Sequence, residues 1–138
     1  MARNRASAKA AGARAERNLA DYLAAALGDD RIDRRVKRGI KDRGDVSGVR
    51  AHGQRVVVEV KDCSTAKLPQ WTAEAHHEAG NDDALVGVVI AKRRGTTDPG
   101  KWWVHLTVDD LLALLTGHRH GHRQDFADDG QAATGEPK

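Results

Sequence analysis

Apolar residues recur at intervals of three and four along an alanine-rich stretch near the start of the chain, from Ala8 to Leu27. This spacing places them on one face of a helix, and no proline interrupts the stretch. The sequence therefore predicts a helix over residues 8–27, with Gly28 as its C-terminal cap and residues 1–7 as a flexible N-terminus. The apolar stripe consists of Ala15, Leu19, Tyr22, Leu23, Ala26 and Leu27.

Five later stretches have the composition of β-strands. The clearest is a continuous apolar run over residues 84–92, which predicts a strand covered on both faces. The second and third strands are joined by Ala51, His52 and Gly53, which indicates a hairpin with a three-residue loop. The expected strands are residues 31–37, 45–50, 55–62, 84–92 and 101–107.

Two shorter helices complete the pattern. One covers residues 68–79 and has a proline in its first turn; the other covers residues 108–115 and can be capped by Thr107. The order α-β-β-β-α-β-β-α predicts an α/β sandwich with a central mixed sheet flanked by helices. We expect one domain over residues 8–116, and a disordered tail over residues 117–138, which have almost no apolar content.

The composition fits a globular domain of 138 residues, with 39% apolar and 31% charged residues. No stretch approaches the ~18 consecutive apolar residues that a membrane span needs, and the N-terminus lacks the apolar segment of a secretory signal. A single cysteine, Cys63, excludes an intrachain disulfide and fits a reducing compartment. We therefore expect a cytoplasmic protein with no membrane partner.

The net charge of +3 is unevenly distributed along the chain. Residues 1–43 contain twelve Lys and Arg against six Asp and Glu, whereas residues 44–138 contain eleven against fourteen. This asymmetry favours contact with a polyanion at one end of the fold. A solvated basic face explains the same charges equally well.

The expected hairpin brings two carboxylates together. A three-residue loop pairs Arg50 with Gln54, and this register places Asp45 directly opposite Glu59, with Lys61 on the same face as Glu59. Two opposed carboxylates repel each other, and a hard divalent cation with oxygen ligands would offset that repulsion. The register is decisive, because a two-residue turn would place Asp45 opposite Val60.

Glu16 lies on the apolar stripe of the first helix, three residues before Leu19. A carboxylate at the edge of a buried face is costly unless it is paired or bound to a metal. If this helix packs on the face that carries Asp45 and Glu59, Glu16 can reach the same cation. The alternative is a carboxylate that extends into water.

Lys61 would place an ammonium group beside that cation, where it could orient a water molecule and offset charge on a phosphate. Alternatively, Glu59 and Lys61 form a surface pair on an edge strand, since Glu-x-Lys is a common sequence. The combination of features favours the site: Gly44 and Asp45 enter one strand, and Glu59 and Lys61 follow a run of valines in the next.

These motifs, G12-A-R-A-E16, G44-D45 and E59-V-K61, resemble the PD-(D/E)XK nuclease superfamily and, more narrowly, the archaeal-type and phage-encoded Holliday-junction resolvases. The resemblance extends over residues 12 to about 115 and implies the α-β-β-β-α-β core of a restriction-endonuclease-like fold. Two positions depart from the pattern. Gly44 stands where many members have proline, and Glu74 stands where a tyrosine often follows Gln70 by four residues.

The resemblance implies roles for individual residues. Asp45 and Glu59 would be metal ligands together with the backbone carbonyl of Val60. Lys61 would be the catalytic lysine and Glu16 an accessory catalytic carboxylate. The implied cofactor is Mg²⁺, with Mn²⁺ as a substitute, and the implied reaction is phosphodiester hydrolysis by an endodeoxyribonuclease of the crossover-junction type.

Basic residues near the expected site could hold DNA phosphates. A solvated run of loop charges is the alternative for each of them. The candidates are Arg34, Arg35, Lys37 and Arg38 before the hairpin, and Lys92, Arg93 and Arg94 after the apolar strand.

The resemblance further implies branched or duplex DNA as the partner, a role in DNA recombination, a bacterial or phage-infected host cell, and a homodimer, since two symmetric cuts need two active sites. Two other functions stay open. One is a nickase or repair nuclease of the same fold. The other is a non-catalytic DNA-binding module, which would not need the complete set of carboxylates.

Two adjacent tryptophans, Trp102 and Trp103, lie in the last expected strand. They could stack on bases. Because neighbouring side chains in a strand point in opposite directions, we expect one to pack inward and the other against a covering helix or a partner.

Overall fold

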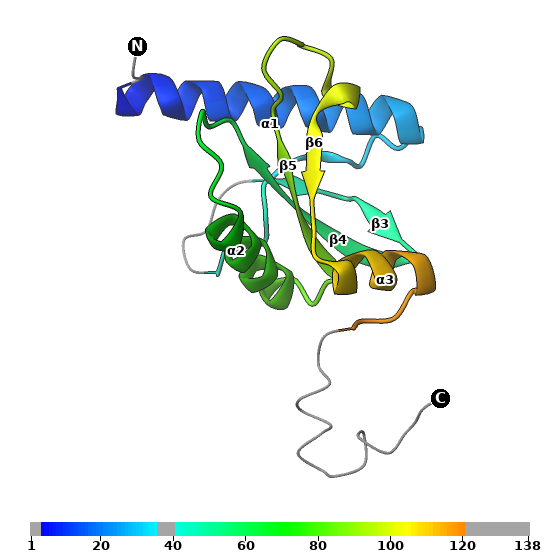
Figure 1. The fold of residues 1–138 in the computed structure, drawn as a ribbon. Coiled ribbons are helices and arrows are strands. Elements are labelled where there is room, and N and C mark those ends of the chain that lie inside the picture. The colour runs from blue at the N-terminus through cyan, green and yellow to red at the C-terminus, as the bar shows by residue number, and fades with distance from the viewer. Residues whose placement is uncertain (1–3, 36–40, 121–138) are drawn as a thin grey trace.

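A computed structural model describes residues 4–35 and 41–120 of the protein (Figure 1). Lys37, Arg38 and most of the tail expected to be disordered lie outside these residues. The described elements are, in chain order, α1 (Arg5–Leu27), β1 (Asp33–Arg34), β2 (Val46–Ser47), β3 (Arg50–Ala51), β4 (Gln54–Lys61), α2 (Leu68–Asn81), β5 (Val86–Ala91), the 3-10 helix η2 (Pro99–Lys101), β6 (Trp103–His105) and α3 (Val108–Thr116).

The described residues form an α/β structure in which three α-helices flank a mixed, open sheet of six strands. The strands lie in the order β1-β2-β4-β5-β6, and β3 also pairs with β4. The central strands β4 and β5 are parallel, because α2 connects them as a crossover, and every other pairing is antiparallel. The α/β class and the mixed sheet are therefore confirmed.

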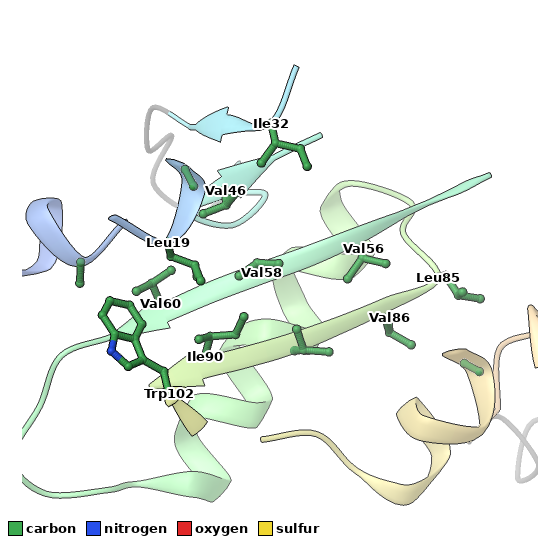
Figure 2. Close-up of a cluster of buried hydrophobic side chains, with 14 residues drawn as sticks. Leu19, Ile32, Val46, Val56, Val58, Val60, Leu85, Val86, Ile90 and Trp102 are labelled. Carbon is green, nitrogen blue, oxygen red and sulfur yellow. The ribbon is translucent and has the colours of Figure 1, made fainter. Parts of the chain in front are cut away.

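Alternation along β4 divides the core into two layers. Val56, Val58 and Val60 pack against α1 and α3, in a cluster that includes Leu19 and Trp102 (Figure 2). Val57, on the opposite face of the strand, packs against α2. Thus α1 and α3 pack on one face of the sheet and α2 packs on the other.

The helix ends follow from local hydrogen bonding. α1 begins at Arg5 rather than Ala8, because the side chain of Asn4 accepts a hydrogen bond from the Ser7 N–H at 2.8 Å. Residues 5–7 are consequently helical, although the sequence predicts flexibility there. Gly28 ends α1 with φ +63°, as expected. None of the helices described for residues 4–35 and 41–120 has the length and apolar character that crossing a membrane requires.

The hairpin has a different register from the predicted one. Arg50 pairs with Arg55, not with Gln54, because the turn consists of only His52 and Gly53, with φ values of +54° and +72°. Nearer the site, Val46 pairs with Val58. Between these pairs, residues 47–49 lie opposite residues 56–57, so a β-bulge adds one residue.

The bulge is formed at Gly48, which has φ +90°. A Cβ atom at this position would lie 2.7 Å from the carbonyl oxygen of Arg31, so only glycine fits. This extra residue explains why the predicted strand 45–50 is observed as two short strands, β2 and β3. It also offsets the shorter turn and returns β2 to the predicted alignment with β4.

Candidate active site

Asp45 lies where the chain leaves its pairing with β4, next to the Val46–Val58 pair. The residue lies just before β2, and its backbone N–H donates to the Val58 carbonyl at 2.8 Å. Its carboxylate Oδ2 accepts a hydrogen bond from the Val60 N–H, also at 2.8 Å. Asp45 is only 1% exposed. Its side chain thus accepts the hydrogen bond that a backbone carbonyl of a neighbouring strand would otherwise accept from β4. Asp45 is held by Val58 and Val60, so it does not form the predicted ladder pair with Glu59.

Gly44 allows this approach. Its φ is +99°, and a Cβ atom would lie 2.9 Å from Val57 Cγ1 and 3.1 Å from the Val58 carbonyl oxygen. Proline requires φ near −65° and could not adopt this conformation. Glycine rather than proline at this position is therefore a consequence of the backbone path into Asp45.

Glu59 and Lys61 lie on the α2 face of β4, side by side as the alternation predicts. Lys61 Nζ lies 3.3 Å from Glu59 Oε2 and donates to Glu74 Oε1 at 2.7 Å. Glu59 is only 5% exposed, whereas the side chain of Lys61 is 17% exposed. The lysine therefore connects a buried carboxylate to a more exposed one on α2.

Burial, together with the neighbouring carboxyl groups of Glu78 and Asp45, raises the pKa of Glu59 to about 9. Two ionised carboxylates have no proton to share, so Glu59 and Glu78 form a hydrogen bond only when one of them is protonated. Burial alone would lower the pKa of Lys61, but the hydrogen bond to Glu74 and the charge of Glu59 outweigh this effect and raise it.

Glu78 is the acidic residue at this site that the sequence reasoning missed. It lies on α2 and is 7% exposed. The buried residues of α2 are Trp71, Ala75, Glu78 and Ala79, at helical spacing. A glutamate on that stripe is the same signal that identified Glu16 on α1, and it could have been recognised.

Glu16 is buried, being 6% exposed, so it does not extend into water. However, α1 packs on the opposite face of the sheet from Glu59, through Ala15 and Leu19. The packing expected to bring Glu16 beside Glu59 is therefore not observed. Instead, Glu16 Oε1 accepts hydrogen bonds from Arg34 Nε at 3.1 Å and Nη2 at 2.8 Å, and this pairing offsets the cost of its burial.

The oxygen atoms at the end of β4 fit a hard divalent cation. Glu59 Oε1 is buried and accepts no hydrogen bond from the described residues. A cation there would replace the proton that its raised pKa retains, and Asp45 lies close enough to contribute to that shift. In residues 4–35 and 41–120 no three His, Cys, Asp or Glu side chains form a metal-binding group. The expected ligand set needs only two, because its third ligand is a backbone carbonyl.

That third ligand, the carbonyl of Val60, is oriented by the sheet. The carbonyl of Lys61 accepts a hydrogen bond from the Lys92 N–H at 2.8 Å, toward β5. Successive carbonyls of a strand point to opposite edges, so the Val60 carbonyl points toward the edge where its own N–H contacts Asp45.

Of the basic residues predicted to contact DNA, the two described before the hairpin are paired with buried carboxylates. Arg34 binds Glu16, and Arg35 Nη1 lies 3.4 Å from an oxygen of Asp82. These arginines stabilise the fold around the site, and Lys37 and Arg38 fall outside the described residues.

The second basic group lines an open groove of about 1100 Å³. Lys92, Arg93 and Arg94 follow β5, and the opposite wall follows β4 at residues 62–64. Both segments leave the carboxyl ends of the two parallel strands, directly after Lys61 in β4. The groove therefore begins where the candidate site ends.

Comparison of this chain with known protein families, with characterised proteins and with solved structures finds no match.

Proposed function

We propose that this protein is a metal-dependent DNA endonuclease with a restriction-endonuclease-like fold of the PD-(D/E)XK type. The observation that carries the proposal is the convergence of Asp45, Glu59 and Lys61 at the end of β4, beside a basic groove. Buried carboxylates next to an ammonium group, at the edge of a groove whose basic residues can contact phosphates, suit phosphodiester hydrolysis.

Asp45, Glu59 and the Val60 carbonyl would hold Mg²⁺ or Mn²⁺, which would supply Lewis acidity for attack on the phosphorus. Lys61 is held between Glu59 and Glu74, so its ammonium group has a defined position before substrate arrives. Its raised pKa keeps it charged at neutral pH, where it can offset negative charge that develops on the phosphate. Because Lys61 is more exposed than either acid, the phosphate approaches from its side.

Branched DNA is the substrate class that we propose, with a Holliday junction as the leading candidate and a homodimer as the active form. The motifs at Asp45 and Glu59–Lys61 support this choice through their resemblance to resolvases. A nickase or repair nuclease of the same fold is the second candidate, because the groove requires only a polyanion.

The test is cleavage of a synthetic four-way junction with Mg²⁺ or Mn²⁺, with and without a chelator, compared with linear duplex DNA. Asp45→Asn and Glu59→Gln should cut at least about 10²–10³-fold more slowly while still binding the junction. Asp21→Asn is a suitable control, because this exposed residue pairs with Arg17 on α1, away from β4.

Paired symmetric nicks confined to the junction would support a resolvase. Equal cutting of junction and duplex would point to another nuclease of this fold. Binding without cleavage in either metal would indicate a non-catalytic DNA-binding module, and undiminished cleavage by Asp45→Asn would contradict the assigned site.

A further inference from the structure

Trp103 lies on the same face of the sheet as Lys61. The β4–β5 register pairs Lys61 with Ala91, and the β5–β6 register pairs Ala91 with Trp103. Paired residues of adjacent strands share a face, so these three side chains form a row across the sheet. With strands about 4.8 Å apart, the backbone positions of Lys61 and Trp103 are separated by ~10 Å.

The exposure of Trp103 distinguishes it from the other two tryptophans. Trp71 and Trp102 are 5% and 6% exposed and belong to the core, whereas Trp103 is 52% exposed. Trp102, which directly follows η2, thus packs inward, whereas none of the helices in the described part of the chain buries Trp103. An indole that remains half exposed beside a candidate active site offers a large apolar plane to a ligand.

Arg93 places a positive charge over this ring. Its guanidinium carbon lies 4.5 Å from the centroid of the Trp103 ring. The same arginine lines the basic groove together with Lys92 and Arg94. An aromatic ring with an arginine over it, beside a groove lined by basic residues, is a combination by which proteins bind single-stranded nucleic acid.

We propose that Trp103 and Arg93 bind an unpaired nucleobase of the DNA strand whose phosphate lies at Lys61. This inference rests on the proposed nuclease function and adds a feature of its substrate. A base within an intact duplex is already stacked on both sides and cannot present its plane to an indole. A stacked strand rises about 3.4 Å per nucleotide, so the ~10 Å between Lys61 and Trp103 corresponds to roughly three nucleotides. The unpaired base would therefore lie within a few nucleotides of the cut.

The test measures DNA binding in the presence of a chelator, so that it is independent of cleavage. Trp103→Ala should weaken binding to DNA with unpaired bases by about 5- to 100-fold and leave binding to a fully paired duplex unchanged. Trp103→Phe should retain part of the affinity. Val104→Ala is the matched control, because Val104 is 53% exposed in the same strand but pairs with Ile90 on the opposite face.

Intrinsic fluorescence provides a second measurement. Since Trp71 and Trp102 are buried, quenching of the wild-type signal by DNA with unpaired bases should come from Trp103 and should disappear in Trp103→Ala. Paired duplex should quench little.

Equal loss of affinity for paired and unpaired DNA in Trp103→Ala would overturn the inference. So would a change from dimer to monomer by light scattering with DNA binding unchanged, because the tryptophan would then contact a second copy of the chain. If the wild-type protein binds and cuts DNA and Trp103→Ala behaves identically, only the inference fails. If the wild-type protein binds no DNA, the proposed function fails with it.

Discussion

The fold strongly changes the acidity of Glu59. Burial and the nearby carboxyl groups raise its pKa to about 9, so in the absence of a cation it holds a proton at neutral pH. The proposed divalent cation would compete with that proton for the same oxygen atoms. The residue would therefore connect the proposed cation binding to the stability of the metal-free protein.

This coupling predicts the pH dependence of stability in a chelator. The unfolded chain releases the Glu59 proton near pH 4.5, whereas the folded protein retains it to about pH 9. The contribution is thus fully present below pH 4.5 and is lost as the pH rises toward 9. Thermal unfolding measured across this range should show wild-type stability falling more steeply than that of Glu59→Gln. Parallel curves would contradict the raised pKa.

Asp45 has a structural role that can be separated from its proposed catalytic one. Its carboxylate is the acceptor for the buried Val60 N–H. Asp45→Ala should cost about 1–3 kcal/mol in the free energy of unfolding, because that donor loses its partner. Asp45→Asn retains an acceptor oxygen and should cost less. Denaturant unfolding of both variants would measure the difference, and equal losses would argue against this role.

Among the elements, the segment that enters β2 controls where the site forms. Gly44 has φ +99° and lies against Val57 and Val58, so the chain turns away from β4 at Asp45. The opposite side of the candidate site is formed by α2, on which Glu74 and Glu78 lie one turn apart. Glu74 pairs with Lys61, and Glu78 interacts with Glu59. The site is therefore built between a diverging strand and a crossover helix.

Substitution of Gly44 should therefore lower the stability of the folded protein. Gly44→Ala should lower the free energy of unfolding by about 1–3 kcal/mol, through strain at φ +99° and contact with β4. Gly12→Ala is the matched control, because Gly12 lies within α1 and an added Cβ meets nothing within 4 Å. The control should be neutral or gain about 0.5–1 kcal/mol. Equal effects of the two changes would contradict the proposed strain.

For the whole molecule, the basic groove is placed by the parallel pair of strands. The segments that follow β4 and β5 leave the same edge of the sheet, and the groove forms between them. Ala8, near the N-terminal end of α1, also lines it. Arg31, just after the other end of α1, is roughly 30 Å away, since a helix rises about 1.5 Å per residue.

The groove predicts a salt dependence for DNA binding. Replacing Lys92 and Arg94 together by alanine should weaken junction binding and reduce the slope of log affinity against log salt concentration by up to about 2, near 0.9 for each lost phosphate contact. Arg31→Ala removes an exposed arginine outside the groove and should leave the slope unchanged. Titrations at several salt concentrations would measure this, and equal slopes for both variants would place the DNA elsewhere.

The sequence alone determined the features that depend on neighbours within a few residues. The helix periodicities, the Thr107 cap and the αL glycine after α1 were all confirmed, because each is a local hydrogen-bonding or packing requirement. Alternation along β4 correctly placed Glu59 and Lys61 on one face of the strand. Val56, Val58 and Val60 lie on the other face.

Tertiary structure decided which distant groups meet. The bulge at Gly48 depends on the backbone at Arg31, and no local pattern announces that contact. A buried carboxylate needs a compensating charge, but its spacing does not specify which one, and Glu16 is compensated by Arg34. Position in the sequence fixes only which face of its own element a side chain occupies. The element packed against that face, and hence the partner, is set by how the whole chain is folded together.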